Sequence, residues 1–290
     1  MGDAAARAAE LVRKADKKLA SFSFFGNKYE DAAEWLEKAA VQFKLAQAWP
    51  DAGATYEKLA AVHLKLDSKH EAASSYMEAA KCYQKTDKKD VLRALHNAVE
   101  YYTEIGRLSM AAKNLREAAE TLEKQGMKED AIEFYLRAAE LYAGEEQSSE
   151  ANKCRLKVAQ FAAELERYRE AVEIYEGVAR TSVENNLLKY SAKGYLLNAG
   201  ICQLCTGDEV AIRSALDRYE DIDINFAGSR EAKLLKDLAD ACEAGDSEGF
   251  TDALAEYDNM TRLDAWKTSL LLRVKKRMAA ADDGDEPDLT

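Results

Sequence analysis

Proline is almost absent from this sequence, at 2 of 290 residues. Because proline breaks the interior of a helix, its scarcity in a chain rich in Ala, Glu, Lys and Leu favours a fold made almost entirely of helices. Hydrophobic residues make up 47% of the chain and charged residues 32%, which is typical of a packed protein and excludes general disorder. The length of the chain suits one large domain or two small ones.

Basic residues are fewer than acidic ones, and the formal net charge is -12 at pH 7. General nucleic-acid binding needs a basic surface and is therefore disfavoured. The chain shows neither a signal-peptide pattern nor an apolar run long enough to span a bilayer. Its five cysteines are scattered and odd in number, which suits free thiols in a reducing compartment. We therefore expect a cytoplasmic protein.

The motifs of most enzymes and cofactor sites are missing as well. No phosphate-cradling glycine loop occurs, and none of the three histidines (His63, His70 and His96) has a Cys or another His at metal-ligand spacing. The stretch "CQLC" at 202–205 is formally C-x-x-C, but it lies in an apolar helical stretch without a second pair. This context favours a buried helix face over a redox or zinc site. We expect a binding scaffold with no catalytic residue, no metal and no cofactor.

Internal similarity with a spacing of about 40 residues organises the chain, in the range of helical-pair repeats. One series of matching segments is "DAAEWLEKAA" at 31, "EAASSYMEAA" at 71 and "MAAKNLREAAE" at 110. The series between them is "DAGATYEKLAA" at 51, "DAIEFYLRAAE" at 130 and "EAVEIYEGVAR" at 170. Small residues at i and i+8 with an aromatic residue at i+4 let one helix nest closely against the next. In this way Ala131, Tyr135 and Ala139 match residues 171, 175 and 179.

Short breaks separate helices of about four turns each. Four of the breaks contain a glycine where a helix C-cap needs a left-handed residue, namely Gly26, Gly106, Gly126 and Gly144. The predicted fold is all-α: a tetratricopeptide-like, right-handed superhelical solenoid of antiparallel helix pairs over 1–205. A C-terminal helical bundle over 206–281 follows, with helices at 208–220, 229–244, 247–258 and 262–281. An acidic tail over 282–290 ends the chain.

Lysines recur at one position of the repeat. Lys113, Lys153 and Lys193 follow one another at steps of 40 residues, with Arg116 and Lys157 close by. Equivalent positions of successive repeats align in a solenoid, so these lysines are predicted to form a column on one face. The column either binds an acidic, elongated partner across several repeats or is an ordinary solvated face.

The acidic tail surrounds a single apolar residue, Leu289. Its carboxylates are Asp282, Asp283, Asp285, Glu286 and Asp288. The tail either keeps the protein in solution or docks as an acidic peptide on a basic partner, with Leu289 filling a small pocket.

An aromatic cluster, Phe22, Phe24 and Phe25, lies in the segment 21–28 between two predicted helices. The cluster either caps the core of the first repeat or, with serines and a glycine making a turn and lysines on both sides, touches a membrane interface.

Several segments together carry a resemblance to a known family. They include "FFGNKYEDAAEWLEKAA", "ANKCRLKVAQFAAELERY", "NNLLKYSAKGYLLNAGICQLC" and "YDNMTRLDAWKTSLLLRVKK", and the "DLT" ending. In this order and spacing they resemble the α-SNAP (Sec17-like) soluble NSF attachment proteins, especially the plant members. The resemblance implies an adaptor that lies along the syntaxin-containing four-helix SNARE bundle. It also implies that the adaptor recruits the hexameric ATPase NSF, which disassembles the bundle during vesicle transport and membrane fusion.

The resemblance also implies roles for individual residues. The positions that match the SNARE-binding face are Lys113, Arg116, Lys153, Lys157, Lys193 and Arg230. The positions that match the loop that weakly touches the membrane are Phe22, Phe24 and Phe25. The positions that match NSF-binding groups are Asp208, Asp240, Glu243, Asp288 and Leu289. Two departures from the family pattern are Pro287, which interrupts the acidic run, and Ala244, where some members carry a carboxylate.

An alternative function is a generic tetratricopeptide co-chaperone that captures the C-terminal peptide of a partner. Such a protein would need a carboxylate clamp of Lys and Asn within one groove and the shorter repeat of 34 residues. The 40-residue period and the evenly spaced lysines disfavour it.

Overall fold

The computed structural model describes residues 2–21, 28–86 and 88–282. Within these ranges all regular secondary structure is helical, which confirms the predicted all-α class. The chain divides into two compact units, Met1–Ala151 and Asn152–Thr290. None of the helices in the described ranges is both long and apolar enough to cross a bilayer.

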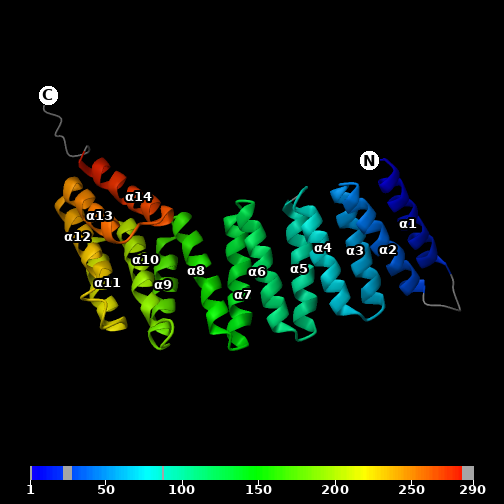
Figure 1. Ribbon diagram of the computed structural model, residues 1–290, viewed down its shortest axis with the longest axis horizontal. Coiled ribbons are helices and arrows are strands. Elements are labelled where there is room, and N and C mark those ends of the chain that lie inside the picture. Colours follow the sequence, from blue (N-terminus) through cyan, green and yellow to red (C-terminus); the bar gives the residue numbers. More distant parts are fainter. Residues whose placement is uncertain (1, 22–27, 87, 283–290) are drawn as a thin grey trace, which may run out of the picture. The chain divides into compact units, whose positions relative to one another are not determined.

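The first unit is a row of antiparallel helices, each packed against the next (Figure 1). Such a row is the helical-pair solenoid that the 40-residue period predicts. Its helices are α1 (Gly2–Ala20), α2 (Lys28–Leu45), α3 (Trp49–Lys65), α4 (Lys69–Tyr83), α5 (Lys88–Glu104), α6 (Leu108–Lys124) and α7 (Lys128–Gly144). The next helix, α8 (Ser148–Glu164), begins in this unit and continues into the second one.

Alanines and one aromatic ring form the buried face of these helices. In α7, Ala131, Tyr135 and Ala139 are all buried, as the matching segments predict. The same triplet of positions is buried in α3, where Ala52 and Ala60 flank Tyr56. Because alanine adds little beyond the backbone, the neighbouring helix can approach closely, and the ring fills the space between two turns.

Left-handed residues close the turns between successive helices. Gly106 (φ 67°) and Gly126 (φ 73°) adopt this conformation, as predicted, whereas Gly26 lies outside the described residues. The prediction for Gly144 is wrong, because Gly144 is the last residue of α7 and the left-handed residue is Glu146 (φ 57°). The left-handed position of the turn is therefore occupied by a non-glycine residue where the sequence has no glycine there. Three other non-glycine residues take up the same conformation: Gln47, Asp67 and Glu166.

The second unit gathers its helices around α10 (Ala192–Thr206), which packs against α9, α11, α12 and α14. The surrounding helices are α9 (Tyr168–Val183), α11 (Glu209–Ile222), α12 (Arg230–Ala244), α13 (Ser247–Met260) and α14 (Ala265–Asp282), with a 3-10 turn at Lys189–Ser191. The last four lie within three residues of the predicted bounds.

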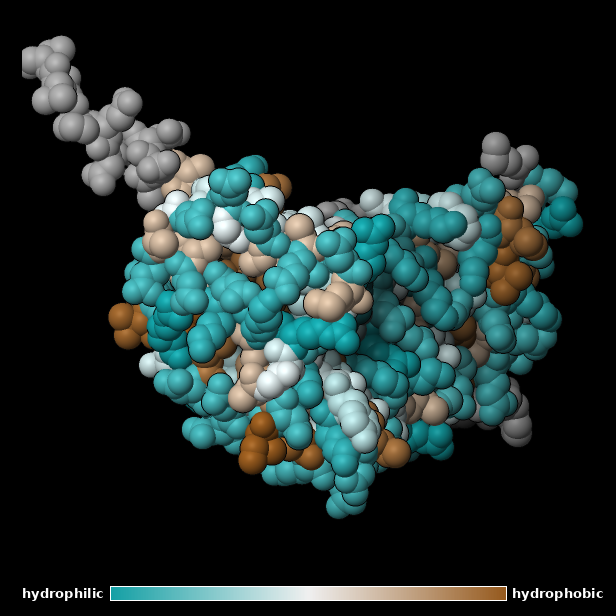
Figure 2. Space-filling model, turned by 60° about the vertical axis from the view of Figure 1, so that its left-hand side comes forward, coloured by the Kyte–Doolittle hydropathy of each residue, from teal (hydrophilic) through white to brown (hydrophobic). Residues whose placement is uncertain are grey.

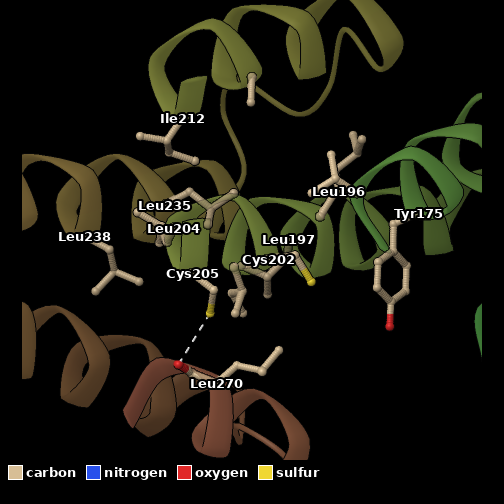
Figure 3. Close-up of a cluster of buried hydrophobic side chains, with 14 of the residues drawn as sticks. Tyr175, Leu196, Leu197, Cys202, Leu204, Cys205, Ile212, Leu235, Leu238 and Leu270 are labelled. Atoms are coloured by element: carbon tan, nitrogen blue, oxygen red, sulfur yellow. Dashed lines mark hydrogen bonds between the residues drawn. The ribbon is translucent and has the colours of Figure 1, made fainter. Parts of the chain in front are cut away.

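Helix α10 is apolar around most of its circumference, which is typical of a helix buried on all sides. Figure 3 shows its side chains Leu197, Cys202 and Cys205 inside the cluster, with Leu235 from α12 and Leu270 from α14 around them. The Cys205 Sγ donates to the backbone oxygen of Leu270 at 3.6 Å. The "CQLC" stretch is therefore a buried helix face, as expected.

Two arginines, four residues apart on α14, form hydrogen bonds to the C-terminal ends of α8 and α10. The Arg273 guanidinium donates to the backbone oxygen of Glu164, the last residue of α8, at 3.1 Å. The Arg277 guanidinium donates to the backbone oxygens of Leu204 and Cys205 near the end of α10, at 2.8 Å each. Carbonyls at helix C-termini lack intrahelical partners and carry partial negative charge, so a cation is well placed there.

Alanine substitution distinguishes a left-handed turn glycine from a helical one. Gly126 and Gly144 lie in the same unit, and a Cβ on either would meet no atom within 4 Å. We expect Gly126→Ala to lower the free energy of unfolding by about 1 kcal/mol, because alanine is strained at positive φ. Gly144→Ala is the matched control and should raise it by up to about 1 kcal/mol. Urea unfolding followed by circular dichroism measures both, and shifts of the same sign would contradict the assignment of the turn.

Candidate functional site

Four of the predicted SNARE-binding residues lie in the second unit. Lys153 is exposed and Lys157 half-buried, one turn apart on α8, and the Lys157 Nζ lies 5.7 Å from the centre of the Phe161 ring. Lys193 is half-buried in the first turn of α10, and Arg230 is the exposed first residue of α12. Each of these side chains comes from a helix whose opposite face is anchored in the core, so the charges are held by rigid elements.

The other two predicted residues lie on α6 of the first unit and differ in their environment. The side chain of Lys113 is 63% exposed, and its Nζ lies 3.9 Å from Glu117. The Arg116 guanidinium forms ion pairs with Glu150 and, at 3.6 Å, with Glu120. Arg116 therefore bridges neighbouring segments of its own unit, whereas Lys113 presents its charge to solvent. That all the lysines form one column stays a prediction.

The predicted NSF-binding carboxylates lie at the ends of helices in the second unit. Asp208 caps α11, where it accepts a hydrogen bond from the backbone N–H of Ala211 at 2.9 Å. Asp240 and Glu243 lie near the end of α12, with side chains 57% and 58% exposed. Both bind the guanidinium of Arg213 on α11, at 2.5 Å and 2.6 Å. These hydrogen bonds raise the pKa of Arg213 above its usual value.

The buried cysteines of α10 lack the properties of a redox or metal site. Burial raises the pKa of Cys205 to about 12 and that of Cys202 still further, so the thiolate that would react or bind zinc is disfavoured. Across the described ranges, His, Cys, Asp and Glu side chains form no group of three or more that could hold a metal ion.

An apolar spot on the connector between α9 and α10 was missed by the reasoning from sequence. Leu187 and Tyr190 are 89% and 81% exposed, and the Lys189 Nζ lies 5.5 Å from the centre of the Tyr190 ring. The face of the molecule drawn in Figure 2 is mostly hydrophilic, with a few separate apolar residues. The sequence signal that could have revealed it is the length of this connector, residues 184–191, which exceeds the short connectors between α6, α7, α8 and α9.

Five predicted site residues lie outside the described ranges: Phe22, Phe24, Phe25, Asp288 and Leu289. The helices before and after the aromatic segment, α1 and α2, contact each other through two polar interactions. The Lys28 Nζ donates to the backbone oxygen of Leu19 at 3.0 Å, and Lys18 pairs with Asp31 at 2.6 Å. These contacts hold the end of α1 and the beginning of α2 together.

Comparison with known proteins assigns the family. The model of the family described as soluble NSF attachment protein, SNAP, matches residues 6–279. The chain belongs to this family. An alpha-soluble NSF attachment protein of Vitis vinifera is 51% identical over the whole of both chains. The family resemblance that the sequence carries, including its likeness to plant members, is therefore confirmed.

Family members from distant organisms are similar along their whole length. The human alpha-soluble NSF attachment protein is 41% identical over 99% of this chain and 97% of its own. A probable vesicular-fusion protein sec17 homolog of Schizosaccharomyces pombe is 40% identical over 94% of this chain and 97% of its own. The matches thus include both the solenoid helices and the last helices of the second unit.

Proposed function

We propose that this chain is a non-enzymatic adaptor that binds SNARE complexes and recruits and stimulates the ATPase NSF, which disassembles them in vesicle transport and membrane fusion. The observation that carries the proposal is the family match over residues 6–279, together with full-length identity of 51% to a soluble NSF attachment protein. The names of these relatives refer to NSF attachment and to vesicular fusion. They do not favour the alternative of a generic co-chaperone. The adaptor would act in the cytoplasm and associate peripherally with membranes.

The SNARE-binding surface proposed here combines exposed and half-buried cations with an apolar spot. Lys153, Lys157, Lys193 and Arg230 supply positive charge from three helices of the second unit. Leu187 and Tyr190 supply apolar area just before Lys193 in the chain. Exposed cations attract an acidic helical bundle and set its orientation, whereas apolar area contributes affinity that salt does not screen.

Charge reversal on α8 tests the SNARE-binding surface. We expect Lys153→Glu with Lys157→Glu to weaken binding to a SNARE complex by at least ~10-fold at low salt, because two attractive contacts become repulsive. The matched control reverses two exposed lysines elsewhere in the second unit, Lys236 and Lys276. Binding is measured by pull-down at several salt concentrations, and folding by circular dichroism. Equal binding by the variant and the control would remove α8 from the interface.

The proposed NSF-binding end comprises the carboxylates Asp208, Asp240 and Glu243, followed in the chain by the acidic tail with Leu289. Helix α14, which leads to the tail, is fixed to α8 and α10 by the contacts of Arg273 and Arg277. The proposal assigns recruitment to the carboxylates and stimulation of NSF to Leu289.

Substitution of the penultimate leucine separates stimulation from SNARE binding. We expect Leu289→Ala to abolish most NSF-dependent disassembly while leaving SNARE binding unchanged, because the lost side chain is assigned to NSF alone. Disassembly is followed by loss of fluorescence transfer within a labelled SNARE complex. The adjacent Thr290→Ala should behave like the wild type. Loss of SNARE binding by Leu289→Ala would contradict this division of roles.

The proposed membrane loop contains Phe22, Phe24 and Phe25. Fully burying one Phe is worth about 1.5–3 kcal/mol, and each lysine near an anionic surface adds about 1 kcal/mol. A partly inserted loop therefore binds weakly and reversibly by itself. It becomes effective where several copies gather around one membrane-anchored complex.

Vesicle flotation tests the membrane loop directly. We expect Phe24→Ser with Phe25→Ser to reduce flotation with phosphatidylcholine vesicles that contain phosphatidylserine, because apolar contact with the bilayer is lost. The matched control, Leu187→Ser with Tyr190→Ser, removes similar apolar area from another exposed connector and should float like the wild type. If the phenylalanine variant floats as the wild type does, these aromatics belong to the core of the first repeat.

A further inference from the structure

Arg213 is an internal partner of two carboxylates that the proposed function assigns to NSF. A single nitrogen, Nη2, lies 2.5 Å from Asp240 Oδ1 and 2.6 Å from Glu243 Oε2. Arg213 belongs to the N-terminal half of α11, and the two carboxylates belong to the last part of the neighbouring helix α12. The guanidinium thus spans two helices and binds two anions at once.

The contact is accessible to solvent and therefore to a partner. The side chains of Asp240 and Glu243 are more than half exposed, and that of Arg213 is 39% exposed. Each carboxylate uses one oxygen toward Arg213, which leaves its second oxygen able to accept from a cationic group outside the protein. A partner that binds here therefore meets three charges of the adaptor, of which two are negative and one is positive.

The end of helix α12 favours a cation from another helix beside Asp240 and Glu243. Its last turn contains no basic residue, and two carboxylates near a helix C-terminus are unfavourable next to the partial negative charge of the terminal carbonyls. Two other arginines of the second unit contact other groups: Arg218 pairs with Glu176, and Arg277 contacts the end of α10. Arg213 is in direct contact with both carboxylates and offsets part of their charge.

We propose that Arg213 is an internal competitor for cationic groups of NSF at Asp240 and Glu243, and that it weakens NSF capture. This inference rests on the proposed function. With Arg213 in place, the local charge of the three groups is -1, from two carboxylates and one guanidinium; without it, the charge is -2. A partner cation is attracted less strongly and must share the carboxylates, so the adaptor holds NSF reversibly.

Association of NSF with the SNARE-bound full-length adaptor tests this inference. Arg213→Gln removes the charge and keeps a polar side chain of similar reach. We expect it to raise the association rate and the affinity for ATP-analogue-loaded NSF about two- to fivefold at low salt, and less at high salt. Arg213→Lys, which keeps the charge, should stay close to the wild type. Unchanged or weaker binding by Arg213→Gln would overturn the inference.

Two further variants separate a local effect from a global one. Arg262→Gln removes the same charge at the far end of α13, a helix of 14 residues or about 20 Å, and should leave NSF binding unchanged. In the background of Asp240→Asn with Glu243→Gln, Arg213→Gln should have no further effect. The local mechanism would be overturned if Arg262→Gln raised the affinity for NSF as much as Arg213→Gln does. It would also be overturned if Arg213→Gln still raised that affinity when both carboxylates are replaced.

The same experiment separates failure of this inference from failure of the proposed function. If wild-type adaptor does not capture NSF, the proposed function fails and this inference with it. If Asp240→Asn with Glu243→Gln binds NSF as the wild type does, the assignment of these carboxylates fails. If those substitutions weaken NSF binding and Arg213→Gln does not strengthen it, only the inference about Arg213 is wrong. Arg213 forms an exposed surface contact, so its replacement is compatible with folding, and thermal melting verifies this.

Discussion

Close contact between successive helices through alanine and glycine is the constraint on which the rest of the structure depends. Two glycines show how close neighbouring helices come: a Cβ on Gly53 would lie 2.4 Å from the Tyr83 ring, and one on Gly200 would lie 2.3 Å from Leu235. At such positions no side chain fits without movement of the neighbour. Changes in charge are therefore tolerated best outside these helix contacts, at exposed positions such as Lys153.

Helix α14 connects the parts of the second unit that the proposed function uses. Arg273 and Arg277 fix it to the C-terminal ends of α8 and α10, and the Trp266 indole N–H donates to the backbone oxygen of Gln160 on α8 at 3.2 Å. Helices α8 and α10 carry Lys153, Lys157 and Lys193, while α14 leads directly to the acidic tail. One helix thus joins the proposed SNARE-binding elements to the part of the chain proposed to stimulate NSF.

The sequence was sufficient for the helices because their signals are local and repeated. Buried positions such as Tyr135 follow from the spacing of small and aromatic residues within one helix. Gly144 shows the limit of that approach, because the turn is placed by the length of the repeat and Glu146 adopts the left-handed conformation without being glycine. Contacts across the fold have no such local signal: Arg213 meets Asp240 and Glu243 only after α11 and α12 have packed.

The charged interface residues that the structure describes share one physical property, which is that each is at least partly exposed and contributes little by itself. A fully buried ion pair would be costly to form and slow to exchange, whereas exposed charges are screened by salt and bind reversibly. Strength must then come from the number of contacts along one elongated partner and from several adaptors on one complex. The competition proposed for Arg213, which contacts two carboxylates, fits this regime, because it would lower the affinity of one site and leave capture to the sum of many contacts. For an adaptor that must release its partners after each round of disassembly, many weak contacts are a better solution than a few strong ones.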